Sequence, residues 1–75
     1  MKLIGCPASA MEPQKIVAFN DKGNKIFELY VDGSMSISNR LLYPNEDALE
    51  IAYLISKNFH LFYNNIENVN GDDQA

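Results

Sequence analysis

Apolar and mixed positions alternate between Ile16 and Ile37, and this period of two constrains the fold more than any other feature of the chain. Successive side chains of a β-strand point to opposite faces of a sheet, so residues of one parity share a face. The odd positions are apolar: Val17, Phe19, Phe27, Leu29, Val31, Met35 and Ile37. The even positions are mixed: Ile16, Ala18, Ile26, Glu28, Tyr30, Ser34 and Ser36. The pattern predicts a sheet whose odd-numbered face is buried and whose even-numbered face points outward.

Two glycines indicate how the strands are connected. A three-residue loop ending in Gly33 pairs Leu29 with Met35 and Phe27 with Ile37, whereas a two-residue loop would split the apolar set between the two faces. The same loop ending in Gly23 pairs Val17 with Phe27. Glycine suits the last loop position because the backbone there has a positive φ. We therefore predict three strands, at about residues 15–20, 24–30 and 34–38.

A helix is predicted after the strands, beginning at Pro44 and ending near Tyr63. Proline is favoured at the first helical position, and acidic residues nearby favour the same helix end. One apolar stripe recurs at helical spacing: Ala48, Ile51, Ala52, Ile55, Phe59, Phe62 and Ile66. The predicted fold is α+β, a three-stranded antiparallel β-meander packed against one C-terminal α-helix. This single domain is expected over residues 15–66, between an irregular segment at 1–14 and a disordered tail at 67–75.

Composition narrows the class of protein. With 75 residues, of which 47% are hydrophobic and 21% charged, the chain is long enough for one small globular domain. A net charge of −4 and scattered lysines argue against nucleic-acid binding, which needs clustered cations. No apolar run has the length of a membrane span, so no membrane association is expected. The single cysteine, Cys6, excludes an internal disulfide, and a cytoplasmic location is expected.

Residues that could carry catalysis are few. His60 and Cys6 have no partner at a metal-ligand or redox spacing. Glu46, Asp47 and Glu50 share the first turns of the predicted helix, where acidic residues complement the helix dipole. The glycines form no phosphate-binding motif. The sequence therefore predicts no metal, no cofactor and no enzymatic activity.

Apolar residues beyond those of the predicted core indicate an interface. Leu54 and Leu61 lie away from the helical stripe, and the even-numbered sheet face is itself partly apolar. The predicted interface residues are Ile16, Ala18, Ile26, Glu28, Tyr30, Leu54 and Leu61. We expect a homo-oligomer built on these surfaces. The alternative is a monomer in which other apolar residues cover them: Leu3, Ile4, Leu41 and Leu42.

The stretch from Ile16 to Gly33, followed by an acidic helix, resembles small phage and prophage accessory proteins. The residues that carry the resemblance are Phe19, Asp21, Gly23, Ile26, Leu29, Asp32 and Gly33. The resemblance covers about residues 15–60 and implies a cytoplasmic accessory protein that modulates a host or phage protein. We expect a small non-enzymatic protein-binding module whose protein partner is unknown. The alternative is a small nucleic-acid-associated regulator that contacts phosphates through Lys15, Lys22, Lys25 and Arg40.

Overall fold

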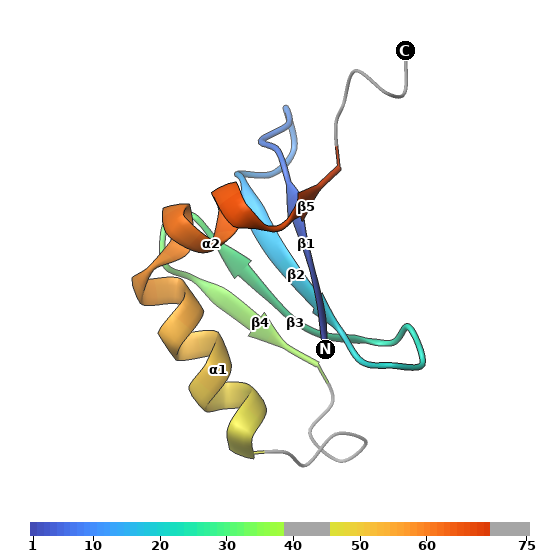
Figure 1. Cartoon of the computed structure of the whole chain (residues 1–75). Helices are drawn as coiled ribbons and strands as arrows, with labels where there is room; N and C mark the ends of the chain where they lie inside the picture. The colour runs from blue at the N-terminus through green and yellow to red at the C-terminus, as the bar shows by residue number, and fades with distance from the viewer. Residues whose placement is uncertain (39–45, 70–75) are drawn as a thin grey trace.

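The computed structural model describes residues 1–38 and 46–69, which form one mixed sheet and two helices (Figure 1). The strands are β1 (Lys2–Cys6), β2 (Lys15–Phe19), β3 (Lys25–Tyr30), β4 (Met35–Ile37) and β5 (Glu67–Asn68), and the helices are α1 (Glu46–Lys57) and α2 (Phe59–Asn65). The strand order is β4-β3-β2-β1-β5, antiparallel except for the β1–β5 pair. The predicted α+β class is confirmed, and the meander β2–β3–β4 is extended on the β2 side.

Two segments predicted to lack regular structure each contain a strand, so the predictions are wrong for residues 2–6 and 67–68. In the segment 1–14, β1 pairs with β2, placing Leu3 beside Ala18. In the predicted tail, β5 pairs in parallel with β1, and Val69 donates its backbone N–H to the carbonyl of Gly5 at 2.7 Å. Residues 70–75 of that tail lie outside the described residues. β5 has only two residues, and β1 contains Gly5 and is followed by Pro7, which weaken a strand pattern in the local sequence.

Gly5 allows β5 and α2 to approach β1 closely. A Cβ atom at this position would lie 2.1 Å from Asn68 Oδ1 and 2.9 Å from the Tyr63 ring. The Asn68 amide nitrogen donates hydrogen bonds to the carbonyls of Tyr63 at 3.1 Å and Ile66 at 2.9 Å. The missing side chain of Gly5 therefore lets one asparagine connect the end of α2 to the sheet.

Both three-residue loops are confirmed. Gly23 and Gly33 have φ values of +85° and +96°, a region that other residues rarely adopt. The loop ending in Gly33 pairs Phe27 with Ile37 and Leu29 with Met35, as predicted. In this loop the Asp32 carboxylate accepts hydrogen bonds from the backbone N–H and the hydroxyl of Ser34 at 2.9 and 2.7 Å.

A β-bulge between β2 and β3 changes which residues of β2 face the core. Phe19 pairs with Lys25 as the predicted register requires, but Ala18 pairs with Phe27, so Ile26 is an extra residue in β3. The predicted pairing of Val17 with Phe27 is therefore wrong. Beyond the bulge, Val17 lies opposite Glu28 on the face away from the core cluster.

The core lies between the sheet and the helices. Its buried residues are Ile16, Ala18, Ile26, Phe27, Leu29, Ala52, Ile55 and Phe59. Ile16 and Ala18 have no exposed surface, so their predicted place on an outward face is wrong, as is that of Ile26. Val17, Phe19 and Val31 were predicted to lie on the buried face under the helix, and this is wrong. Val17 and Phe19 lie on the opposite face of the sheet, and Val31 is exposed in the loop after β3.

The predicted single helix is interrupted at Asn58. This residue has φ −126° and ψ 38°, and its side-chain amide donates to the Leu54 carbonyl at 3.1 Å. Asparagine competes for backbone hydrogen bonds in this way, which weakens a helix interior. In Figure 1, α1 lies alongside β4 and β3, and α2 crosses the sheet near the ends of the strands. No helix in the described part of the chain is long and apolar enough to cross a membrane.

The apolar stripe is confirmed in part. Ala52, Ile55 and Phe59 are buried, and Phe62 and Ile66 pack against the core from a half-buried position. Ile51 is exposed instead, because it lies at the edge of the stripe. Pro44 and the side chain of Ala48 lie outside what the structure describes.

Candidate functional site

A network of charged and hydroxyl groups occupies the sheet face away from α1 and α2, which we call the outer face. Glu28 is at its centre, and its side chain is 12% exposed. One carboxylate oxygen accepts from Lys15 Nζ at 2.8 Å and from the Tyr30 hydroxyl at 3.1 Å. The other accepts from Lys25 Nζ at 2.6 Å. The strand register places these groups together. Lys15 of β2 pairs with Tyr30 of β3, and Glu28 is two residues from Tyr30 on the same face of β3.

The loop after β1 adds a second carboxylate to the network. Glu12 accepts from Lys15 Nζ at 2.9 Å, and its carboxylate lies 3.3 Å from the Tyr30 hydroxyl, whose single proton it shares with Glu28. The Ser9 hydroxyl accepts hydrogen bonds from the backbone N–H groups of Met11 and Glu12, which holds this loop in a turn. Lys15 therefore lies between two carboxylates.

The charged groups of the network shift one another's pKa values. Hydrogen bonds from Lys15 and Lys25 lower the pKa of Glu28 from 4.5 to about 2, although burial acts in the opposite direction. Hydrogen bonds to Glu12 and Glu28 raise the pKa of Lys15. Among the described residues, every buried side-chain nitrogen or oxygen atom has a hydrogen-bond partner. The network is therefore ionised and internally satisfied at neutral pH.

The surroundings of Cys6 do not activate its thiol, and His60 lies between solvent and an aromatic ring. Cys6 is half-buried in β1 beside Lys15, and burial raises the pKa of its thiol more than Lys15 lowers it. A thiol with a raised pKa is a poor nucleophile at neutral pH. His60 is exposed and contacts the Phe59 ring edge-on, with the ring centres 5.7 Å apart. Within residues 1–38 and 46–69, no group of three His, Cys, Asp or Glu side chains is arranged to hold a metal ion.

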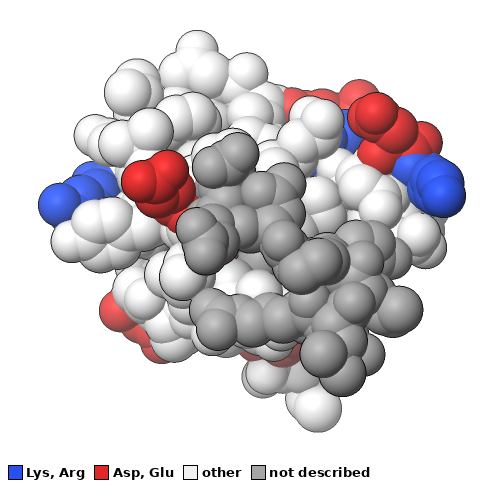
Figure 2. Space-filling model, turned by 90° about the horizontal axis from the view of Figure 1, so that it is seen from below, with Lys and Arg blue, Asp and Glu red and all other residues white. Residues whose placement is uncertain are grey.

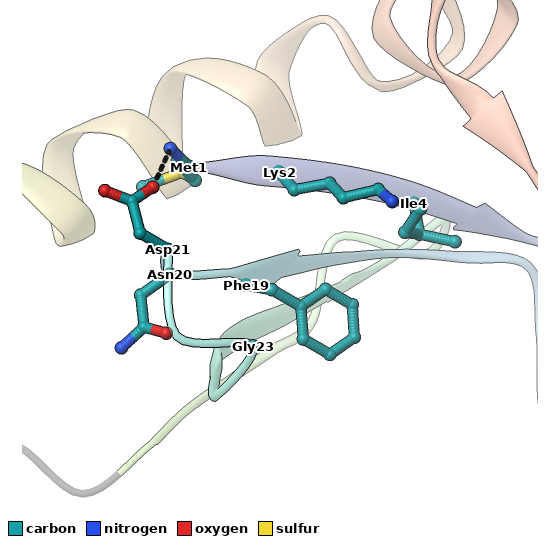
Figure 3. A pocket seen from close by; sticks show the side chains of 7 residues that line it. All are labelled: Met1, Lys2, Ile4, Phe19, Asn20, Asp21 and Gly23. Atoms are coloured by element: carbon teal, nitrogen blue, oxygen red, sulfur yellow. Dashed lines mark ion pairs between the residues drawn. The ribbon is translucent and has the colours of Figure 1, made fainter.

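A hollow lies at the end of the sheet where β1 begins and β2 ends (Figure 3). Its lining consists of Met1, Lys2, Ile4, Phe19, Asn20, Asp21 and Gly23. The amino group of Met1 lies 3.8 Å from the Asp21 carboxylate across its rim. Ile4 and Phe19 supply its apolar part, and both are half-buried. The charged groups that line the hollow already have partners, because Met1 pairs with Asp21 and Lys2 pairs with Glu67.

Several large apolar side chains of the helices are exposed: Leu49, Ile51, Tyr53, Leu54 and Leu61. We call these exposed side chains, together, the helical surface. Tyr53 and Leu54 are each 57% exposed and Leu61 is 64% exposed. Lys57 Nζ lies 4.4 Å from the centre of the Tyr53 ring, so a cation borders this surface. Exposed large apolar side chains favour contact with another protein, because a partner that covered them would remove them from water.

The structure separates the predicted interface residues into three groups. Ile16, Ala18 and Ile26 belong to the core, and Glu28 and Tyr30 belong to the outer-face network. Leu54 and Leu61 are exposed, as their positions on the helix predicted, while their role in an interface stays a prediction. Leu49 is not among the predicted interface residues, and the sequence predicts only a general exposed or interface role for Tyr53. The spacing of Tyr53 and Leu49, four residues apart and off the buried stripe, is the signal that could have placed both in it.

Two of the cations proposed for phosphate contact are neutralised by a carboxylate in the described part of the chain. Lys15 and Lys25 are both bound to Glu28, and Arg40 lies outside the described residues. Figure 2 shows acidic and basic side chains interspersed among uncharged ones on the end seen from below. This charge distribution does not favour the nucleic-acid alternative, because backbone binding requires several cations free to contact phosphates.

Comparisons with protein-family models, with curated proteins and with solved structures give no match to this chain. Its function is therefore argued from the geometry and chemistry of the outer face and the helical surface. Of the two, the helical surface leaves large apolar groups in water, whereas the charged groups of the outer face are paired.

Proposed function

We propose that this chain is a small non-enzymatic protein-binding module that contacts a protein partner through the helical surface. The observation that carries the proposal is the exposure of Tyr53, Leu54 and Leu61, each by more than half. Fully burying a leucine side chain contributes roughly 1.5–3 kcal/mol, so these residues gain most from a partner. Tyrosine adds a large contact area with a hydrogen-bonding tip, which suits the centre of an interface.

The outer face is the weaker candidate for this contact. Glu28 and Lys15 already satisfy one another, and Tyr30 completes the network. A partner that covered them would remove water from paired charges without offering a better arrangement, which is unfavourable. We therefore assign the network a role in stabilising the sheet and assign partner binding to the helices.

The chemistry of the outer face supports a non-enzymatic role. Lys15 is held between two carboxylates, and the raised pKa of Cys6 disfavours its thiolate at neutral pH. A catalytic site needs a nucleophile in contact with a base that another group orients. The resemblance to phage accessory proteins, carried by the β2–β3–β4 meander, adds that the partner is a host or phage protein.

The proposal is tested by affinity capture with three forms of the chain. Wild-type protein, Leu61→Lys and Val31→Lys are each immobilised and exposed to an extract of the native cells. Val31 is also exposed but lies in the loop after β3, so Val31→Lys controls for the added cation. We expect one protein other than this chain to be captured by the wild type and by Val31→Lys, and to be lost with Leu61→Lys.

A captured protein that binds all three forms equally would contradict the assignment to the helical surface. Loss of binding with Val31→Lys alone would place the contact at the loop after β3. Both variants should fold, because both substitutions are at exposed positions. Circular dichroism of each form before capture checks this.

A further inference from the structure

The outward side of α1 carries a pattern that is complementary to itself. Glu50, Tyr53, Leu54 and Lys57 are spaced so that they project from one side of the helix, opposite the buried Ile55. All four side chains are exposed. An acidic residue, two apolar residues and a basic residue therefore follow one another along this side.

The order of these residues determines how two copies of the helix can pack. The midpoint between Glu50 and Lys57 falls between Tyr53 and Leu54. When two copies of α1 pack antiparallel about a twofold axis at this midpoint, Glu50 of each copy meets the partner's Lys57. A parallel arrangement would instead place Glu50 against Glu50 and Lys57 against Lys57, which is unfavourable.

The twofold axis also brings the apolar residues together. Tyr53 of one copy lies against the partner's Leu54, and the symmetry repeats the contact. Within one copy, Lys57 Nζ lies 4.4 Å from the centre of the Tyr53 ring, so the cation is next to the apolar centre of the contact. The centre of the contact is thus apolar and each end is closed by an ion pair.

We propose that α1 pairs antiparallel with α1 of a second copy of this chain, with Tyr53 and Leu54 at the centre and Glu50–Lys57 pairs at both ends. The proposal rests on the proposed protein-binding role of the helical surface and names one occupant of it. A helix of twelve residues is about 18 Å long at 1.5 Å per residue. Two helices that touch over this length bury less surface area than a standard stable interface does, so the dimer should be weak and its population should depend on concentration.

Charge reversal tests the pairing directly. Glu50→Lys and Lys57→Glu, made singly, each replace two attractive contacts by two repulsive ones. Each single variant should weaken the dimer about tenfold or more, given the usual strength of exposed ion pairs. An equimolar mixture of the two variants should dimerise again, because each chain then offers the charges that the other needs. The double variant should also regain self-association.

The measurement is sedimentation equilibrium of the purified full-length chain over a range of concentrations. The wild type should approach twice the chain mass of 8.5 kDa as its concentration rises. Leu54→Lys should shift it toward monomer, and Val31→Lys should leave the dissociation constant unchanged. Urea unfolding of each variant shows whether the helix remains folded.

A wild-type chain that stays monomeric at millimolar concentration would overturn the proposal, as would a mixture of the charge variants that fails to associate. A monomer that still captures another protein through Leu61 would overturn only the self-pairing and would leave the proposed function in place. A dimer that follows the charge pattern but captures no other protein supports self-pairing and counts against the proposed heterologous partner.

Discussion

Glu28 should make the stability of this protein depend on pH in a narrow acidic window. Lys15 and Lys25 lower the pKa of its carboxyl from 4.5 to about 2. A group whose pKa falls on folding stabilises the folded state above its unfolded pKa, and this stabilisation is lost as the pH falls through the folded pKa. The contribution should therefore be complete above about pH 5 and largely lost near pH 2.

The size of the effect follows from the same pKa change. At about 1.4 kcal/mol for each unit of pKa, the change from 4.5 to about 2 corresponds to at most about 3.5 kcal/mol at neutral pH. Lys25 is half-exposed and solvent screens its charge, so we expect about 1–2 kcal/mol. Glu28→Gln should lower the free energy of unfolding by this amount at pH 7, and the difference from wild type should shrink between pH 5 and pH 2.

Urea unfolding followed by circular dichroism at several pH values measures this difference. Glu67→Gln is a matched control, because Glu67 is 70% exposed and its nearest cation, Lys2, lies 3.9 Å away. The control should differ from wild type by less than about 0.5 kcal/mol at every pH. A difference between wild type and Glu28→Gln that stayed the same from pH 7 to pH 2 would refute the assignment of the pH dependence to Glu28.

Two further predictions concern substitutions of glycine residues. Gly33→Val should destabilise the protein by about 1–3 kcal/mol, because a β-branched residue is strained at φ +96°; Gly33→Asn should cost less, and an equal urea midpoint for wild type and Gly33→Val would contradict the loop geometry. Gly5→Ala should displace the Asn68 side chain and lose its two hydrogen bonds, at about 1–3 kcal/mol. The Gly5→Ala loss should be much smaller in an Asn68→Ala background, and a double-mutant cycle that found the two changes additive would rule out this contact.

The loops and the β3–β4 register could be predicted because both depend on short stretches of sequence. A glycine marks the end of each loop, and the alternation of apolar residues shows which positions share a face. Gly23 and Gly33 each required a positive φ, and only a three-residue loop kept Phe27 and Leu29 on one face with their partners. The register of β2 was not determined in the same way. From Ile16 to Phe19 every residue is apolar, so either register places apolar side chains on both faces.

The register of β2 is shifted by the β-bulge, and the alternation of apolar residues in the sequence gives no sign of that bulge. It places Ile16 and Ala18 under the helices and leaves Val17 opposite Glu28. The exposure of Leu54 and Leu61 was predictable, because helical periodicity alone separates them from the buried stripe. The outer-face network was not, because it joins Lys15 and Glu28 from different strands with a loop residue, Glu12, that has no periodic signal.

The lengths of the strands have a consequence for solubility. The sheet is bordered by β4, with three residues, and by β5, with two, whereas its inner strands have five or six. An exposed sheet border offers unpaired backbone groups that can recruit strands from other molecules and begin a fibre. The two border strands themselves offer few such groups, and β5 covers the middle of β1 at Ile4 and Gly5. The chain can therefore concentrate exposed apolar side chains on its helices while its sheet remains a poor template for edge-to-edge aggregation.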